Sequence, residues 1–172
     1  MILDNTTSLP RKVGSANSTS AGATLITAAT EGKAIYLVDL LNGDGSNMAT
    51  LKERLAGGPV IAQVPAGGVA SLNAPIKVSP IKVTVNNGSG YAVANGISIT
   101  VDAIPKALLS GDVIYFKNGG VFTLTSGASA NATSLTGNLT VAALVDNEAG
   151  NTKAIVHCAT STKFTATFIE EI

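Results

Sequence analysis

The residues with the greatest catalytic potential stand next to each other near the end of the chain. His157 is the only histidine, and it is followed directly by the only cysteine, Cys158. A cysteine nucleophile needs a base within hydrogen-bonding reach. Neighbouring side chains of a strand point to opposite faces, so these two cannot form that pair with each other. A single histidine also excludes the common multi-histidine metal sites.

A phosphate-binding loop is the next candidate. The segment Glu31-Gly32-Lys33-Ala34 resembles the end of a nucleotide-binding loop. However, Thr27 stands where the first glycine of that motif is required, and Ala34 lacks the hydroxyl group that binds the metal ion. The sequence therefore predicts no nucleotide site here.

A calcium loop is the best metal candidate. Asn42, Asp44, Ser46 and Glu53 occupy positions resembling ligands 1, 3, 5 and 12 of a helix-loop-helix calcium site. The position that needs glycine for the sharp turn is Asn47, and the flanking residues are typical of strands rather than helices. We expect a plain loop between strands, and no metal ion.

Pairs of carboxylates could carry acid and base chemistry. Asp112 lies near Lys117 in the sequence, and Asp146 lies near Glu148. Catalytic carboxylates need a cleft, which the sequence does not indicate, so we interpret these residues as solvated turn charges. We therefore expect no enzyme and no cofactor. A cleft lined by Asp112, Asp146 and Glu148 would revive the enzyme hypothesis.

Charge and hydropathy limit the partners. The 172 residues contain eleven Lys and Arg against eleven Asp and Glu, which removes the basic bias expected of a nucleic-acid-binding protein. No apolar run approaches membrane-spanning length, and the N-terminus lacks an export signal, so we expect no membrane partner and synthesis in a cytosol-like compartment. Cys158 is expected in the core, with no disulfide within the chain. Charged residues make up only 13% of the chain, which suits a protein that functions in an assembly.

The elements that would position any site are short β-prone runs separated by turn residues about every ten positions, as in a sandwich or barrel. Residues 1–22 are rich in Ser, Thr and Asn and predict an extended N-terminal arm. The Asn95-Gly96 pair predicts a hairpin turn, and Met48 to Leu55 is the one place where a helix competes. Strands are predicted over 23–29, 34–41, 48–54, 59–64, 69–73, 81–86, 91–94, 97–103, 139–145 and 154–159.

A hairpin lies at the centre of Leu109 to Leu139, where two strand-like runs flank Asn118-Gly119-Gly120. Both faces of the pair are fairly apolar, which predicts packing on two sides, or on one side with the other offered to a neighbour. Because the β pattern restarts near Pro105, we predict an all-β protein with two modules in tandem. These are a jelly-roll-like β-sandwich over 23–104 and a smaller barrel or sandwich over 105–172, after the arm over 1–22.

Two long segments resemble known proteins. SGDVIYFKNGGVFTLTSGASANATSLTG resembles a segment of virion proteins of tailed bacteriophages, found in capsid and capsid-associated β modules. KAIYLVDLLNGDGSNMATLKERLAGGPVIAQVPAGGVASLNAPIKV is similar to the β-sandwich of phage decoration and fibre-like proteins. Together the two segments cover about residues 23 to 140.

The resemblance implies a capsid decoration, or cement, protein. Such a protein would bind the major capsid protein on the outer surface of the virion, clamp neighbouring coat subunits and stabilise the shell by mass action. It would act with further copies of itself, as a homotrimer or homodimer. The alternative is a receptor-binding or glycan-binding module of a head fibre or tail. We expect the contacts to come from a few apolar, aromatic and basic residues: Ile2, Leu3, Arg11, Lys12, Tyr115, Phe116 and Phe122.

Overall fold

The computed structural model describes residues 11–18 and 23–171, and residues 1–10, 19–22 and 172 lie outside the described part. Every regular element of the described residues is a β-strand, so the all-β prediction is confirmed. None of these residues belongs to a helix that is long and apolar enough to cross a membrane. The segment from Met48 to Leu55, where a helix competed, contains strand β4 (Ala49–Glu53).

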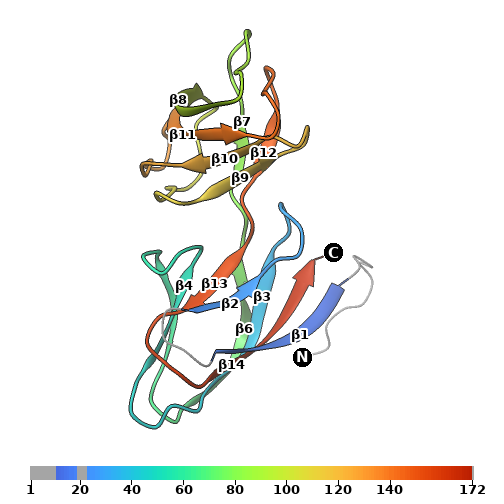
Figure 1. The fold of residues 1–172 in the computed structure, drawn as a ribbon. Helices are drawn as coiled ribbons and strands as arrows, with labels where there is room; N and C mark the ends of the chain where they lie inside the picture. The colour runs from blue at the N-terminus through green and yellow to red at the C-terminus, as the bar shows by residue number, and fades with distance from the viewer. Residues whose placement is uncertain (1–10, 19–22, 172) are drawn as a thin grey trace.

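Two four-stranded antiparallel sheets form a sandwich, which we call the sandwich module (Figure 1). A single apolar core lies between them and includes Leu37 and Phe164 from the first sheet and Leu51 and Val156 from the second. In strand order, the first sheet is β1 (Arg11–Ser18), β14 (Phe164–Glu171), β3 (Ile35–Asn42) and β6 (Val69–Val78), and the second is β2 (Ala23–Thr27), β13 (Ile155–Cys158), β4 and β5 (Val60–Val64).

A six-stranded antiparallel sheet forms the other body, which we call the half-barrel module. The sheet curls, because an isolated bridge between Val85 and Val101 brings its two outer edges together. The module has a core of its own, with Ile114, Phe122 and Leu139 fully buried. In strand order, the sheet is β7 (Lys82–Thr84), β12 (Ala149–Asn151), β9 (Val113–Phe116), β10 (Val121–Leu124), β11 (Ser134–Thr140) and β8 (Ala94–Thr100).

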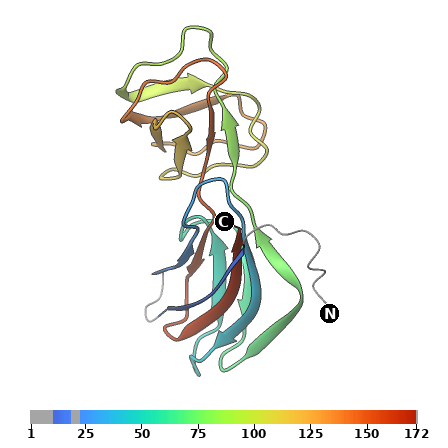
Figure 2. The ribbon, with the colours of Figure 1, turned by 90° about the vertical axis from the view of Figure 1, so that its right-hand side faces the viewer.

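The strand pairing differs from the predicted division of the chain at residues 104 and 105. β7 and β8 belong to the half-barrel module rather than to the first module, and β13 and β14 return to the sandwich. The half-barrel module is therefore an insertion between β6 and β13, and the chain passes from one module to the other twice (Figure 2). Periodicity reveals which residues form strands but not which strands pair, because pairing depends on contacts far apart in the sequence.

The predicted arm over 1–22 is only partly described, and the described part is a strand. Residues 11–18 form β1, which pairs along its length with β14, from Arg11 opposite Glu171 to Ser18 opposite Phe164. This stretch is therefore an edge strand of the sandwich rather than a loose extension. Its many small polar residues concealed it, because an edge strand needs less apolar surface than a central one.

The apolar cores are formed by strands in which buried and more exposed side chains alternate. In β14, Phe164, Ala166 and Phe168 are buried, while Thr165 and Thr167 between them are half-buried on the opposite face. Successive side chains of a strand point to opposite faces, so this pattern gives the strand one core face and one wetter face.

The predicted hairpin turn at Asn95-Gly96 is wrong. Both residues lie inside β8, where the pairing with β11 shifts register between Gly137 and Leu139. Gly96 has a φ of +65°, and its amide donates to Asn138 Oδ1 at 2.8 Å. The positive φ that makes Asn-Gly a turn signal here serves a bulge, which is the other common use of such a glycine.

The central hairpin is confirmed, with β9 and β10 paired around the Asn118-Gly119-Gly120 turn. The Phe116 amide donates to the Gly120 carbonyl at 2.8 Å, and Gly119 has a φ of +92°. One face of the hairpin is core and the other is only half-buried, so the pair is packed on one side.

Replacing the most enclosed ring of this hairpin tests the core. Phe122 is fully buried, so Phe122→Ala should lower the free energy of unfolding by about 3–5 kcal/mol, as measured by urea denaturation. Val121, its half-buried neighbour on the opposite face, is the matched control, and Val121→Ala should cost about 1 kcal/mol or less. Equally small losses of the free energy of unfolding for both variants would contradict the assignment of Phe122 to the core.

Candidate functional site at the junction of the two modules

A buried ion pair joins the modules. Arg54, just after β4 of the sandwich, donates from Nη1 to Asp112 Oδ2 of the half-barrel at 2.9 Å, and both residues are 4% exposed. The same Nη1 donates to the carbonyl oxygen of Ala107 at 2.6 Å, and Asp112 Oδ2 accepts a further bond from the Leu109 amide at 2.8 Å. A buried pair with additional hydrogen bonds strongly resists the removal of one partner, because the other charge would remain unpaired.

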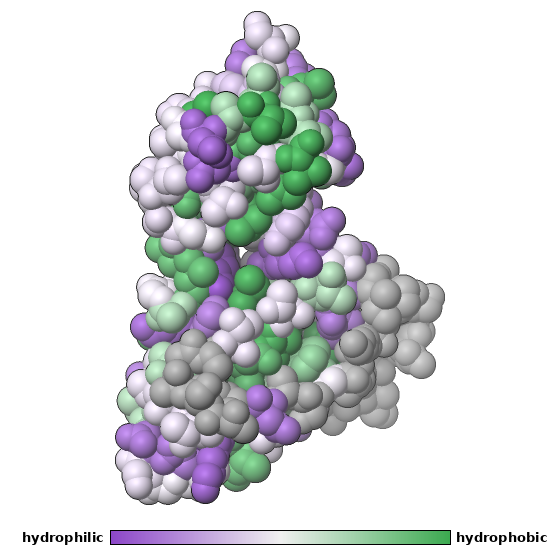
Figure 3. All heavy atoms as spheres, viewed as in Figure 1, coloured by the Kyte–Doolittle hydropathy of each residue, from purple (hydrophilic) through white to green (hydrophobic). Residues whose placement is uncertain are grey.

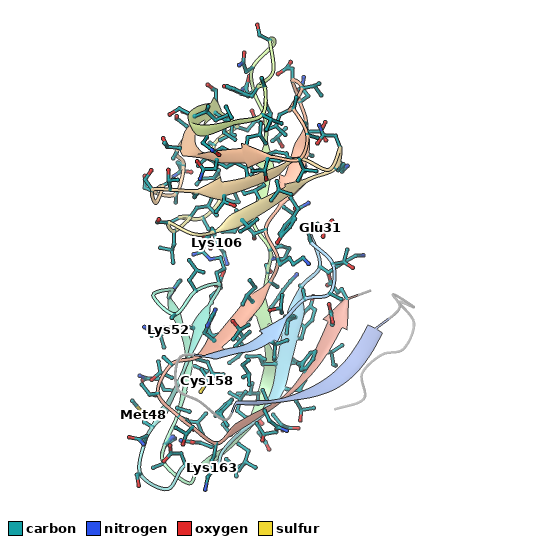
Figure 4. The ribbon with its side chains drawn as sticks, in the orientation of Figure 1. Glu31, Met48, Lys52, Lys106, Cys158 and Lys163 are labelled. Atoms are coloured by element: carbon teal, nitrogen blue, oxygen red, sulfur yellow. The ribbon has the colours of Figure 1, made fainter. Side chains whose placement is uncertain are left out.

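The backbone and neighbouring charges hold Arg54 in place. Its φ is +69°, a conformation that non-glycine residues rarely adopt, and its amide donates to the Ile155 carbonyl at 2.8 Å. Glu53 Oε1 lies 3.8 Å from Arg54 Nε and 3.7 Å from Lys106 Nζ, so two acids and two bases gather at the junction. Figure 4 places Lys106 on the half-barrel side of this junction. Strain of this kind persists only where the surrounding contacts determine it.

The prediction that Asp112 is a solvated turn charge is wrong, because its carboxylate is buried against Arg54 rather than exposed beside Lys117. The other two carboxylates have separate partners. Asp146 accepts from the Asn87 amide at 2.9 Å, and Glu148 accepts from the Asn118 amide at 3.1 Å. None of these contacts joins one of the three carboxylates to another.

The candidate calcium loop is closed by hydrogen bonds instead. The Asp44 carboxylate accepts bonds from the amides of Ser46, Asn47 and Thr162 and from the Thr162 hydroxyl, at 3.0–3.2 Å. The Ser46 and Thr162 amides are the main cause of a pKa for Asp44 well below its ordinary value of 3.8. Glu53 lies at the other end of β4, so the four residues that resemble calcium ligands in the sequence are not brought together. Within the described part of the chain, no three His, Cys, Asp or Glu side chains form a group able to hold a metal ion.

His157 and Cys158 lie on β13 and point to opposite faces, as predicted. Cys158 is fully buried in the sandwich core, and burial raises the pKa of its thiol. A thiol with a raised pKa is a poor nucleophile. His157 lies between Thr24 and Lys52 of the flanking strands, and its Nε2 is 3.4 Å from Thr24 Oγ1.

The predicted interface residues are dispersed. Phe116 and Phe122 are core residues of the half-barrel, 4% and 0% exposed, so they are not available to a partner. Tyr115 is half-buried on the opposite face of β9, where Lys153 Nζ lies 5.2 Å from the centre of its ring. Arg11 and Lys12 lie on β1, opposite Glu171 and Glu170. Ile2 and Leu3 are outside the described residues.

Exposed apolar side chains form two patches that the sequence analysis missed. The distal patch consists of Leu41 and Val69, cross-strand partners of β3 and β6 that are 45% and 69% exposed. The valine patch consists of Val93, Val141 and Val145, which are 50%, 78% and 58% exposed. Figure 3 shows apolar surface on one face of the half-barrel.

Strand register relates two members of the valine patch, Val93 and Val141. The segment 91–94 runs antiparallel beside 139–144, because Tyr91 is bridged to Leu144 and Ala94 is paired with Leu139. Val93 and Val141 therefore lie on neighbouring segments. The signal in the sequence was the run from Val141 to Val145, which we had assigned to a strand over 139–145; β11 in fact ends at Thr140.

No family model, curated protein or solved structure matches this chain.

Breaking the junction ion pair is the first test of this site. Asp112→Ala leaves the Arg54 guanidinium buried and unpaired, so the free energy of unfolding should fall by about 3–5 kcal/mol in chemical denaturation. The control is Asp102→Ala, since Asp102 is an exposed aspartate of the same module whose side chain accepts only from Asn86 Nδ2 among the described residues. A loss for Asp112→Ala no larger than that of the control would contradict the proposed role of the pair.

Acid should remove the contribution of the Asp44 carboxylate to the free energy of unfolding. A carboxylate whose pKa is lowered on folding stabilises the fold above its unfolded pKa, and this contribution is lost as the pH falls. The stability advantage of the wild type over Asp44→Asn should therefore be full at pH 7 and shrink below about pH 4. Denaturation curves measured from pH 7 to pH 2.5 check this. An advantage that stays constant across that range would contradict the assigned role of the carboxylate.

Proposed function

We propose that this chain is a structural virion protein of the capsid decoration class. It binds the major capsid protein on the outer surface of a phage head and clamps neighbouring coat subunits. The observation that carries the proposal is the presence of two exposed apolar patches, one on each of two modules that are locked together. The resemblance of residues 23 to 140 to virion β modules supports the same reading.

The two patches lie on different modules, far enough apart to contact different neighbours. Leu41 lies two residues before Gly43, whose amide donates to the Lys163 carbonyl at 2.7 Å. Figure 4 places Lys163 at the end of the sandwich away from the half-barrel. The distal patch is therefore remote from the valine patch, which belongs to the other module. A protein that clamps subunits needs separate contact surfaces of this kind.

Backbone strain marks the valine patch. Val141 has a φ of +73°, which is an outlier for a β-branched residue, and its side chain is 78% exposed. This conformation costs roughly 1–2 kcal/mol. An exposed valine recovers little of that cost from packing within its own chain, so contact with a partner is the natural reason for the arrangement.

Because the junction holds the two modules in one orientation, binding through one patch would favour binding through the other. The chain passes between the modules twice, and the Arg54–Asp112 pair ties them at a third point. Binding of one module then positions the other without a further loss of orientational freedom, so the second contact forms at a high effective concentration. Further copies, as a dimer or trimer, would extend the clamp around a symmetry axis of the shell.

Reconstitution tests the proposal. Expanded heads of the phage that encodes the chain, stripped of their decoration, should bind the purified protein to a fixed number of copies and gain thermal resistance. Density-gradient sedimentation measures the binding, and scanning calorimetry measures the melting of the shell. Absence of saturable binding would contradict the proposal.

A single substitution separates binding from folding. Val141→Asn removes the apolar side chain but suits the positive φ, which asparagine tolerates. Stability in urea should be unchanged or raised by up to about 1 kcal/mol, while affinity for the heads falls about tenfold or more. The matched control is Val60→Asn, since Val60 is 53% exposed on β5, outside both patches, and this variant should bind normally. Equal affinities for the two variants would exclude the valine patch.

A further inference from the structure

A groove at the junction is unused by the capsid contacts proposed above. It has a volume of about 330 Å³, and both modules line it. Figure 4 shows Glu31 at its sandwich side, on the loop between β2 and β3. We call this the junction groove; its lining residues are Glu31, Tyr115, Phe116, Lys117, Gly119 and Asn151. Small-molecule sites of proteins have volumes of roughly 300–1,000 Å³ and occur preferentially between domains.

The polar side chains that line the groove have unused hydrogen-bond donors and acceptors. Among the residues that the structure describes, the side chains of Glu31, Lys117 and Asn151 make no hydrogen bond or ion pair with one another or with other groups. They come from three separate elements, the β2–β3 loop, the end of β9 and β12. Converging polar groups with unused donors and acceptors are the usual mark of a ligand site.

The walls of the groove are held in position. Lys153 lies over the ring of Tyr115 and donates to the Ala29 carbonyl at 3.5 Å, which joins the half-barrel wall to the sandwich. Gly32 packs closely on Asn151, since a Cβ added at Gly32 would lie 3.3 Å from Asn151 Nδ2. Tyr115 also lines a smaller cavity of about 70 Å³, next to Arg54 and Asp112, so the locked junction fixes this wall.

We propose that the junction groove binds a saccharide. The amide of Asn151 both donates and accepts, Lys117 donates, and Glu31 accepts, which matches hydroxyl groups that do both. Tyr115 adds an aromatic side chain to the wall of the groove, with a hydroxyl at its edge that can donate and accept. A phosphate group would fit less well because the Glu31 carboxylate faces the same space, and a purely apolar ligand would leave the charged rim unpaired.

The proposal stands apart from capsid binding, since it uses neither apolar patch. It can be tested on the full purified chain by saturation-transfer difference NMR. The probes are free glucose, galactose, N-acetylglucosamine, rhamnose and 3′-sialyllactose. Isothermal titration then gives the dissociation constant of any saccharide that shows transfer. We expect at least one probe to bind saturably in the millimolar range, as is usual for a few hydrogen bonds in an open site.

Variants locate the site. Glu31→Ala and Lys117→Ala change exposed side chains and should leave the fold intact, and each should weaken binding about tenfold, as expected for the loss of a hydrogen bond to a charged group. Asn151→Ala should weaken it similarly. Lys52→Ala, on the sandwich away from the groove in Figure 4, is the matched control and should bind as the wild type does. The proposal is overturned if no probe shows saturable binding, or if binding persists unchanged in the three groove variants.

Discussion

The Arg54–Asp112 ion pair is the interaction on which the arrangement of this molecule depends. Each module has its own apolar core, and in the described residues the two cores do not merge. What fixes one module on the other is therefore the junction, where two chain crossings and one buried pair meet. A neutral junction would pack as well, but a charge pair with a strained arginine specifies one orientation, because any other would leave charges buried and unpaired.

The proposed function depends on this orientation at two places. The distal patch and the valine patch would form a clamp only if their separation is constant, and the junction groove exists only while both of its walls are held. The insertion topology supports the same end, since an inserted module is tied at both of its ends, whereas a tandem module is tied at one. The distal patch and the valine patch belong to different modules, and the junction groove lies between the modules.

The sequence predicted strands well where alternation was strong and failed where the determinant was long-range. The hairpin of β9 and β10 followed from apolar runs around Asn118-Gly119-Gly120, which is local information. By contrast, β12 (Ala149–Asn151) lies between the predicted strands over 139–145 and 154–159 and was not predicted. Its three small and polar residues become a strand only through their partners in β7 and β9. The same limit hid the return of β14 to the first sheet.

The candidate site was less predictable than the fold. Asp112 looks like any turn carboxylate until Arg54, 58 positions earlier, is brought to it by the insertion. Asn95-Gly96 carries the signal of a turn, yet the same positive φ suits a bulge, so only the register of β8 against β11 distinguishes the two. The exposed valines were visible in the sequence, but their exposure depends on where β11 ends.

If the chain is the capsid decoration protein we propose, an electron cryomicroscopy reconstruction of the phage particle that carries it is the most direct test. We expect surface density with two lobes in the orientation set by the junction, with the distal patch and the valine patch each against a coat subunit. A shell without this density, or density in which neither patch touches a coat subunit, would contradict the proposed function.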